Sequence, residues 1–149
     1  PGSCWAAAVP VGEWAGIAGP RGSMVIPVGF DWHWLLGDET ALPAIARRLA
    51  ELPATARAVV RVQLRNPQDQ RALASAAQLD VAWVDSLTDA AQALAVPAGP
   101  GYIWAAGEHS EMAALRGVLA AKPGVDAKRT RIAAYWKRGE ADHHENLTA

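Results

Sequence analysis

A chain of 149 residues in which 51% are hydrophobic and 19% charged has the composition of one globular domain with a sizeable core, not of a disordered or fibrous protein. Its 14 basic and 15 acidic side chains nearly cancel, so no net field favours nucleic acid as a partner. The single cysteine, Cys4, excludes an internal disulfide framework, and no apolar run reaches transmembrane length. We therefore expect a cytoplasmic protein without a membrane span.

Residues 1–31 carry a different pattern from the rest of the chain. They predict a helical turn, a β-turn, a short strand and a second β-turn, in that order (Trp5–Ala8 capped by Ser3, Pro10–Gly12, Trp14–Ala18 and Gly19–Gly22). This pattern resembles the last hairpin of a small antiparallel barrel, and a single hairpin is not stable alone. We expect residues 1–31 to end a preceding domain, with Ile26–Asp31 as linker, and the chain to be a piece of a longer protein.

The chain is organised around a strand, a turn and a helix over residues 32–52. Trp32–Leu36 is apolar enough for a buried strand, and Gly37–Thr40 is a polar turn. Apolar residues then recur at helical spacing as far as Pro53, which ends the helix (Leu42, Ile45, Ala46, Leu49 and Leu52). A helix that begins directly after a strand offers free backbone N–H groups and the positive end of its dipole, which together suit a phosphate or pyrophosphate.

Four further strands alternate with helices as far as residue 139. Apolar and β-branched runs predict the strands, and amphipathic stretches predict the helices (strands Arg57–Leu64, Leu79–Val84, Tyr102–Ala106 and Thr130–Trp136; helices Gln68–Ala77, Leu87–Leu94 and Glu108–Ala121). The alternation predicts an α/β domain over residues 32–139 with a doubly wound, five-stranded parallel sheet, followed by a polar tail over residues 140–149. In such a fold the ligand crevice lies at the carboxyl ends of the strands.

The turn Gly37–Thr40 stands where a dinucleotide-binding domain holds the pyrophosphate. Two of the three glycines of the G-x-G-x-x-G fingerprint are absent, and Asp38 and Glu39 repel a phosphate. Either Thr40 and backbone N–H groups contact a pyrophosphate, or the turn only caps the helix, with Thr40 as the N-cap. The residues leave both interpretations open.

Two more strand ends lie at the same edge of the predicted sheet. Gly107, between Ala106 and Glu108, allows a flat ring such as nicotinamide to approach the backbone closely, although an ordinary β–α turn has the same composition. Tyr135–Arg138 combines two aromatic and two cationic side chains. These form either a stacking platform with a positive rim for an anionic ligand or a plain solvated strand end.

The turn Gly37–Thr40 and the strand end at Ala106–Glu108 are called the first and second corners below. Side chains beyond them give conflicting indications of which coenzyme binds. Three arginines around the end of the second strand favour a 2′-phosphate (Arg61, Arg65 and Arg71), whereas Asp85 at the end of the third favours a ribose diol. NADH and NADPH therefore both stay open.

No constellation of acid–base or metal-binding residues is recognisable. A Ser/His/Asp triad, a Cys/His cluster and a carboxylate pair are all missing from the pattern, so we assign no catalytic residue. His143, His144 and Glu145 fit a polar tail better than a metal site. A dinucleotide crevice without acid–base groups suits hydride transfer, in which the cofactor carries the chemistry.

With these corners placed, the sequence resembles the C-terminal half of the siderophore-interacting protein family, flavin-dependent ferric-siderophore reductases of the ferredoxin-reductase-like superfamily. The resemblance runs from Ser3 to about Glu140, and four segments carry it (Ala18–Ser23, Gly37–Ile45, Ala106–Glu108 and Tyr135–Gly139). The second, Gly-Asp-Glu-Thr-Ala-Leu-Pro-Ala-Ile, is the most distinctive.

The resemblance implies an NAD(P)H-binding domain that follows an N-terminal flavin-binding barrel, of which only the last hairpin is present here. Electrons would pass from NAD(P)H through FAD to a ferric siderophore and release the iron as Fe(II), since hard oxygen ligands hold Fe(III) more tightly. The implied partners are the flavin-binding domain and the ferric siderophore, and the fragment alone would be inactive as a reductase. The alternative is a non-catalytic nucleotide-binding or partner-docking module on the same fold.

The resemblance also implies site residues, position by position. Those that would contact the dinucleotide form the first corner (Gly37, Asp38, Glu39, Thr40 and Ala41). Those that would lie near the nicotinamide form the second (Ala106, Gly107 and Glu108). Ser3 would meet the flavin phosphates, although Pro1–Cys4 matches the family's Gly-Pro-Ala-Ser segment only in part. Lys137 or Arg138 would contribute to a basic siderophore site.

Overall fold

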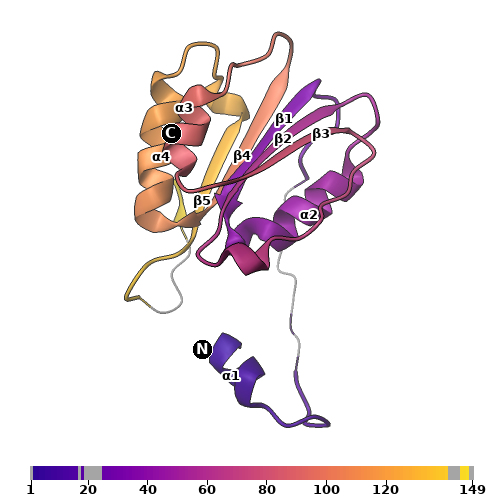
Figure 1. Cartoon of the computed structure of the whole chain (residues 1–149), viewed down its shortest axis with the longest axis vertical. Coiled ribbons are helices and arrows are strands. Elements are labelled where there is room, and N and C mark those ends of the chain that lie inside the picture. Colours follow the sequence, from indigo (N-terminus) through magenta and orange to yellow (C-terminus); the bar gives the residue numbers. More distant parts are fainter. Residues whose placement is uncertain (1, 17, 19–24, 141–144, 148–149) are drawn as a thin grey trace.

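The computed structural model describes residues 2–16, 18, 25–140 and 145–147 of the chain. Within these, one sheet has the strand order β3-β2-β1-β4-β5-β6, with helices on both faces (Figure 1). The strands are β1 (Trp32–Asp38), β2 (Arg57–Gln63), β3 (Gln78–Val84), β4 (Gly101–Glu108), β5 (Thr130–Trp136) and β6 (Glu145–Asn146). The first five are parallel, which confirms the predicted sheet, and β6 runs antiparallel to β5.

Helices divide the core into one layer on each face of the sheet. On one face lies α2 (Leu42–Glu51), which follows the short 3₁₀ helix η1 (Glu39–Ala41) and buries one apolar stripe (Leu42, Ile45 and Leu49). On the other face lie α3 (Leu87–Ala93) and α4 (His109–Ala121), and α4 buries a similar stripe (Met112, Leu115 and Leu119). All of β1 is buried between these layers, because its side chains alternate between the two cores.

The strand order places a change of direction between β1 and β4. The chain proceeds outward from β1 to β2 and β3, then returns to the other side of β1 for β4 and β5. Gly37 near the end of β1 lies beside Ala106 of β4, so the carboxyl ends of the two strands stand level. Open α/β sheets bind ligands at such a switch point.

The segment between β2 and β3 corrects one prediction, because the helix expected over Gln68–Ala77 does not form. Only a short 3₁₀ helix, η2 (Pro67–Asp69), is present before β3. The Ser75 hydroxyl fastens the segment to α2 by donating to the Leu49 carbonyl at 2.6 Å. Two further side chains pack against the core under α2 (Leu73 and Ala77). These tertiary contacts outweigh the weak helix propensity of so short a stretch.

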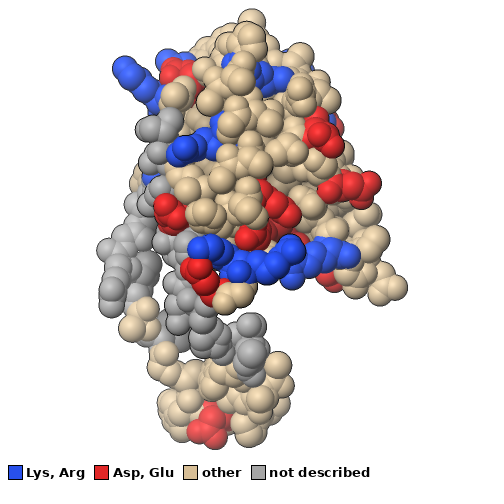
Figure 2. Space-filling model, turned by 90° about the vertical axis from the view of Figure 1, so that its left-hand side faces the viewer, with Lys and Arg blue, Asp and Glu red and all other residues tan. Residues whose placement is uncertain are grey.

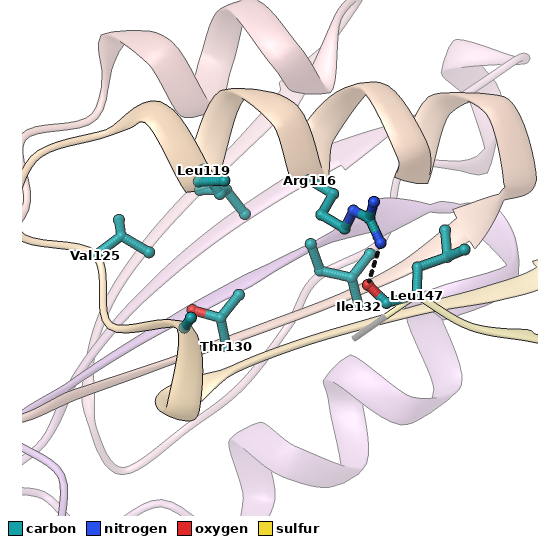
Figure 3. A pocket seen from close by; sticks show the side chains of 8 residues that line it. Arg116, Leu119, Val125, Thr130, Ile132 and Leu147 are labelled. Carbon is teal, nitrogen blue, oxygen red and sulfur yellow. Dashed lines mark hydrogen bonds between the residues drawn. The ribbon is translucent and has the colours of Figure 1, made fainter. Parts of the chain in front are cut away.

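The polar tail predicted over residues 140–149 contains a short strand. The Glu145–Asn146 strand pairs with β5, and the Leu147 N–H donates to the Ile132 carbonyl at 2.9 Å. The Leu147 side chain is buried between α4 and β5. It borders an apolar hollow of about 120 Å³, toward which Arg116 of α4 reaches (Figure 3). One buried leucine is too short a signal for a strand to be read from the sequence.

The described residues do not show the hairpin predicted for the first part of the chain. A helix, α1 (Gly2–Ala8), stands where the helical turn was expected, and Val11 and Gly12 form a turn. Residues 14–16 and 18, where a strand was expected, have no strand structure, and the turn predicted at Gly19–Gly22 lies outside the described residues. A hairpin needs a sheet to pair with, and the described residues of the domain offer this segment none.

Arg48 of α2 holds the segment that precedes β1. Its side chain is buried, and its two Nη atoms donate to the carbonyls of Ile26 at 3.1 Å and Pro27 at 2.9 Å. The Asp31 N–H donates to the Pro100 carbonyl at 2.8 Å. Both ends of the predicted linker Ile26–Asp31 are therefore fixed to the domain.

Candidate functional site

Three segments meet where β1, β4 and β5 end. They are Gly37–Ala41, Gly107–Glu111 and Trp136–Arg138, and Arg65 joins them from just beyond β2. We call this group of residues the carboxyl edge. It contains most of the residues that the sequence assigns to coenzyme and substrate.

The two glycines of the carboxyl edge are required by packing within the protein. A Cβ on Gly37 would meet the Ala106 carbonyl oxygen and the Ala41 Cβ, both at 2.5 Å. A Cβ on Gly107 would meet the Asp38 carboxylate at 2.9 Å. The space over Gly107, which the sequence assigns to a flat ring, is thus occupied by a side chain of the protein.

Asp38 is the centre of the carboxyl edge. Its carboxylate is buried, and one oxygen, Oδ1, accepts from the N–H and the hydroxyl of Thr40. The other, Oδ2, accepts from the Glu108 N–H at 3.0 Å and from the Trp136 indole Nε1 at 2.8 Å. One carboxylate therefore ties the ends of β1, β4 and β5 together and caps η1.

Glu108 is the N-cap of α4, as Asp38 is of η1. Its Oε2 accepts from the hydroxyl and N–H of Ser110 and from the Glu111 N–H at 3.2 Å, and its Oε1 accepts from the Arg138 N–H at 3.2 Å. Burial raises the pKa of this carboxyl, but the hydrogen bonds from Ser110, Arg138 and Glu111 outweigh burial and lower the pKa to about 2. Glu108 is an ionised N-cap, unsuited to proton transfer near neutral pH.

Asp38 and Glu108 accept hydrogen bonds from the backbone N–H groups that a strand-to-helix turn usually offers to a bound anion. The N–H groups of Thr40, Glu108, Ser110 and Glu111 all point at carboxylates of the protein. Pro43, in the first turn of α2, has no N–H at all. The first corner is capped, with Asp38 and not Thr40 as the N-cap of η1, and its contact with a pyrophosphate stays a prediction.

Arg65 lies across the carboxyl edge from the end of β2. Its Nε is 3.1 Å from Glu39 Oε1, and its guanidinium carbon is 4.4 Å from the centre of the Trp136 ring. The Arg65 side chain is 64% exposed, so the cation is open to solvent. An aromatic face and an accessible guanidinium thus lie together at the switch point, an arrangement suited to a planar anionic ligand.

The residues Tyr135–Arg138 do not form one platform. The pairing register shifts beside Gly107 and Glu108, so that Trp136 belongs to the carboxyl edge, whereas Tyr135 packs edge-on against Trp104 near α2. Lys137 forms an ion pair with Glu140, which raises the pKa of Lys137. Arg138 is exposed and contacts Glu108 through its backbone N–H. Of the two predicted aromatics, only Trp136 reaches the site.

Charges of both signs share this end of the molecule. Figure 2 shows Lys and Arg side chains as a band across the lower end of the folded body, with Asp and Glu side chains beside them. The Arg65–Glu39 and Lys137–Glu140 pairs give the carboxyl edge the same mixed character. An anion that binds here therefore competes with carboxylates for the cations.

The three arginines expected to mark a 2′-phosphate do not form one cluster. Arg61 is bound to Asp80 of β3, with Nη2 at 2.9 Å from Oδ2, and Arg71 is exposed after η2. Asp85 lies instead beside α3 and α4, in a hollow of about 270 Å³ that Glu111 also lines. Burial, together with the charges of Asp38 and Glu108, raises the pKa of Glu111. Arg61 is thus engaged away from the carboxyl edge, whereas the hollow at Asp85 borders that edge at Ser110 and Glu111.

The histidines of the chain lie in the core, at the carboxyl edge or outside the described residues. His33 is fully buried in β1, and His109 at the start of α4 is 3.1 Å from Glu145 of β6. His143 and His144 are outside the described residues, and so is the side chain of Ser3. Among the described residues, no three His, Cys, Asp or Glu side chains gather as a metal site would require. The described part also has no helix long and apolar enough to cross a membrane.

Comparison with known proteins decides the relationship. A family profile described as Siderophore-interacting protein matches residues 30–139, which is most of the chain. The chain belongs to the siderophore-interacting protein family. This match spans β1 to β5 and thus the whole carboxyl edge.

Two relatives of this chain carry the names of ferric reductases. Ferric vibriobactin reductase ViuB of Vibrio cholerae is 30% identical over 158 residues, covering 97% of this chain and 58% of the relative. The NADPH-dependent ferric-chelate reductase of Escherichia coli is 32% identical over 141 residues, covering 90% and 55%. The crystal structure of a siderophore utilization protein from T. fusca superposes with a TM-score of 0.85 at 30% identity, covering 96% and 58%. The chain therefore spans little more than half the length of these relatives.

The sequence pattern did not predict the contact between Arg65 and Trp136. Arg65 was grouped with Arg61 and Arg71 because they are neighbours in sequence, yet its side chain reaches across to Glu39 of η1 and Trp136 of β5. A signal was present, because the parallel order β2-β1-β4-β5 places all these strand ends at one edge.

Proposed function

We propose that this chain is the NAD(P)H-binding part of a ferric-siderophore reductase, working in the cytoplasm with a flavin-binding domain as its partner. The observation that carries the proposal is an exposed cation and aromatic ring at the switch point of a sheet that belongs to this family. The named relatives support it, since one reduces a ferric vibriobactin and one is NADPH-dependent.

The carboxyl edge offers a dinucleotide one accessible cation beside one aromatic ring. Arg65 supplies an accessible guanidinium for phosphate, and this guanidinium lies over the ring of Trp136. Asp38 orients the Trp136 ring by accepting a hydrogen bond from its indole N–H. NAD(P)H held there would supply a hydride to FAD, and the two electrons would then reach Fe(III) one at a time.

In this proposal the residues of this chain hold and orient the coenzyme, and none of them transfers a proton. Glu108 stays ionised because of its hydrogen bonds, and Asp38 is engaged by four donors. The exposed Arg138 and the half-buried Lys137, which pairs with Glu140, are the cations beyond β5 that would attract an anionic ferric siderophore. FAD is assigned to the flavin-binding domain, with Ser3 as the residue of this chain that would meet its phosphates.

Exposed apolar side chains before β1 support a neighbouring domain. Five large apolar side chains among the described residues of the first 28 positions are at least half exposed (Trp5, Val11, Trp14, Val25 and Val28). Apolar surface of this kind marks an interaction site. We assign it to contact with the flavin-binding domain.

Calorimetric titration of the chain with NADH and NADPH tests the coenzyme proposal. We expect saturable binding of at least one of them, and an intact fold that binds neither at millimolar concentration would overturn it. The alternative, a non-catalytic nucleotide-binding or docking module, is tested by joining the chain to a complete flavin-binding domain of the family. The reductase proposal expects NAD(P)H to bleach the flavin absorbance and Fe(II) to appear, whereas the alternative expects neither.

A further inference from the structure

The carboxyl edge has a feature that the general dinucleotide fold does not explain. At a strand-to-helix turn the pyrophosphate normally receives backbone N–H groups. Here Asp38 and Glu108 accept the N–H groups of Thr40, Ser110 and Glu111. A diphosphate at this turn has to be neutralised by something other than these donors.

Arg65 is placed to do so. Its guanidinium stands over the Trp136 ring at 4.4 Å, and the indole is itself fixed by the 2.8 Å bond to Asp38. The cation is thus positioned by stacking, while 64% of the side chain remains exposed. An arginine fork binds two phosphate oxygens at once, which a single backbone N–H cannot do.

Arg65 would have to break its ion pair with Glu39 in order to bind a diphosphate. The pair is joined by one contact of 3.1 Å, and the Glu39 side chain is 27% exposed. A pair of this kind near the surface is weak, so a diphosphate can replace the carboxylate. Glu39 therefore competes with the ligand for Arg65.

We propose that Arg65 binds the coenzyme pyrophosphate in place of the capped backbone N–H groups, and that Glu39 is its competitor and not a coenzyme ligand. This inference rests on the proposed coenzyme site and deepens it. It differs from the sequence expectations for both residues, which placed Arg65 at a 2′-phosphate and Glu39 against the dinucleotide. It gives the carboxyl edge similar affinity for NADH and NADPH, because the pyrophosphate is common to both.

The test is calorimetric titration of the chain with NADH, NADPH, ADP and adenosine. Arg65→Ala should weaken NADH, NADPH and ADP alike by about tenfold, the cost of losing a charged hydrogen-bond donor, and leave adenosine unchanged. Glu39→Gln should strengthen the three diphosphates by roughly twofold to fivefold, because it removes the competitor. Circular dichroism and thermal unfolding establish that each variant is folded.

A matched control is available on α2. Arg47 and Glu51 form an ion pair with the same Nε–Oε1 distance of 3.1 Å, away from the carboxyl edge. Arg47→Ala and Glu51→Gln make the same charge changes and should leave all four affinities unchanged. An effect of the control pair equal to that of the Arg65 and Glu39 variants would reduce the result to net charge and overturn the inference.

Two other outcomes would contradict it while leaving the coenzyme proposal standing. A loss confined to NADPH would place Arg65 at a 2′-phosphate, and weaker binding in Glu39→Gln would make Glu39 a ligand. If the unmodified chain binds no dinucleotide, the coenzyme proposal itself fails, and this is separate from any effect of the variants.

Discussion

Single carboxylates decide how the carboxyl edge is built. From the sequence, the acids of the first corner could be predicted to favour a helix start, but the N-cap was assigned to Thr40. The structure puts it at Asp38, because η1 begins at Glu39, two residues before the helix start that an N-cap at Thr40 implies. The link from Asp38 to Glu108 and Trp136 joins residues distant in sequence, which no local pattern reveals.

Replacing Asp38 tests this link. Asp38→Asn keeps the size but turns one acceptor into an amide that faces N–H donors. We expect a loss of about 2–4 kcal/mol in the free energy of unfolding, since buried donors are left unpaired. Urea denaturation measures it, with Glu39→Gln as a neighbouring control, and a loss below about 0.5 kcal/mol would show that the link is not structural.

Glu108 gives the fold a dependence on acid pH. Its folded-state pKa of about 2 lies below the ordinary value of 4.5, so its stabilisation is complete above pH 4.5 and is lost as the pH falls toward 2. The shift corresponds to about 3 kcal/mol. Glu108→Gln should therefore flatten the stability curve between pH 4.5 and 2, and an unchanged slope there would refute the account.

His33 acts in a different pH window. It is fully buried, and burial and the charge of Arg48 lower its pKa from 6.5 to about 4. The unfolded chain therefore takes up a proton between pH 6.5 and 4 that the folded chain does not, and stability declines by about 3 kcal/mol over that range. We expect His33→Leu to abolish the decline in thermal unfolding measured from pH 7 to 4. A decline of the same size in the variant would assign it to other groups.

Among the elements, α2 has a role beyond covering the sheet, because it holds the segment before β1. Arg48→Met keeps the length of the side chain but removes both donors to Ile26 and Pro27. We expect faster hydrogen exchange in residues 28–30, without global unfolding, by mass spectrometry. Arg47→Met, on the exposed face of the same helix, is the control, and equal exchange in the two variants would contradict a specific clamp.

The elements also show what a sequence can and cannot reveal. All five parallel strands were predicted, since each is an apolar or β-branched run that the sheet must bury. The helix expected over Gln68–Ala77 failed because Ser75 and the core under α2 hold that segment in another form. The β6 strand was missed because its stability comes from pairing with β5 and one buried leucine, both remote from its own sequence.

For the whole molecule, family and fold are established, and the coenzyme site is the central proposal. Hydrogen–deuterium exchange of the chain with and without saturating NADH tests it most directly. The account predicts slower exchange in residues 37–41, 64–66 and 136–139 of the carboxyl edge and no change at the opposite end of the sheet, in residues 53–56 and 97–101. Protection confined to the opposite end, or none anywhere while the fold is intact, would contradict it.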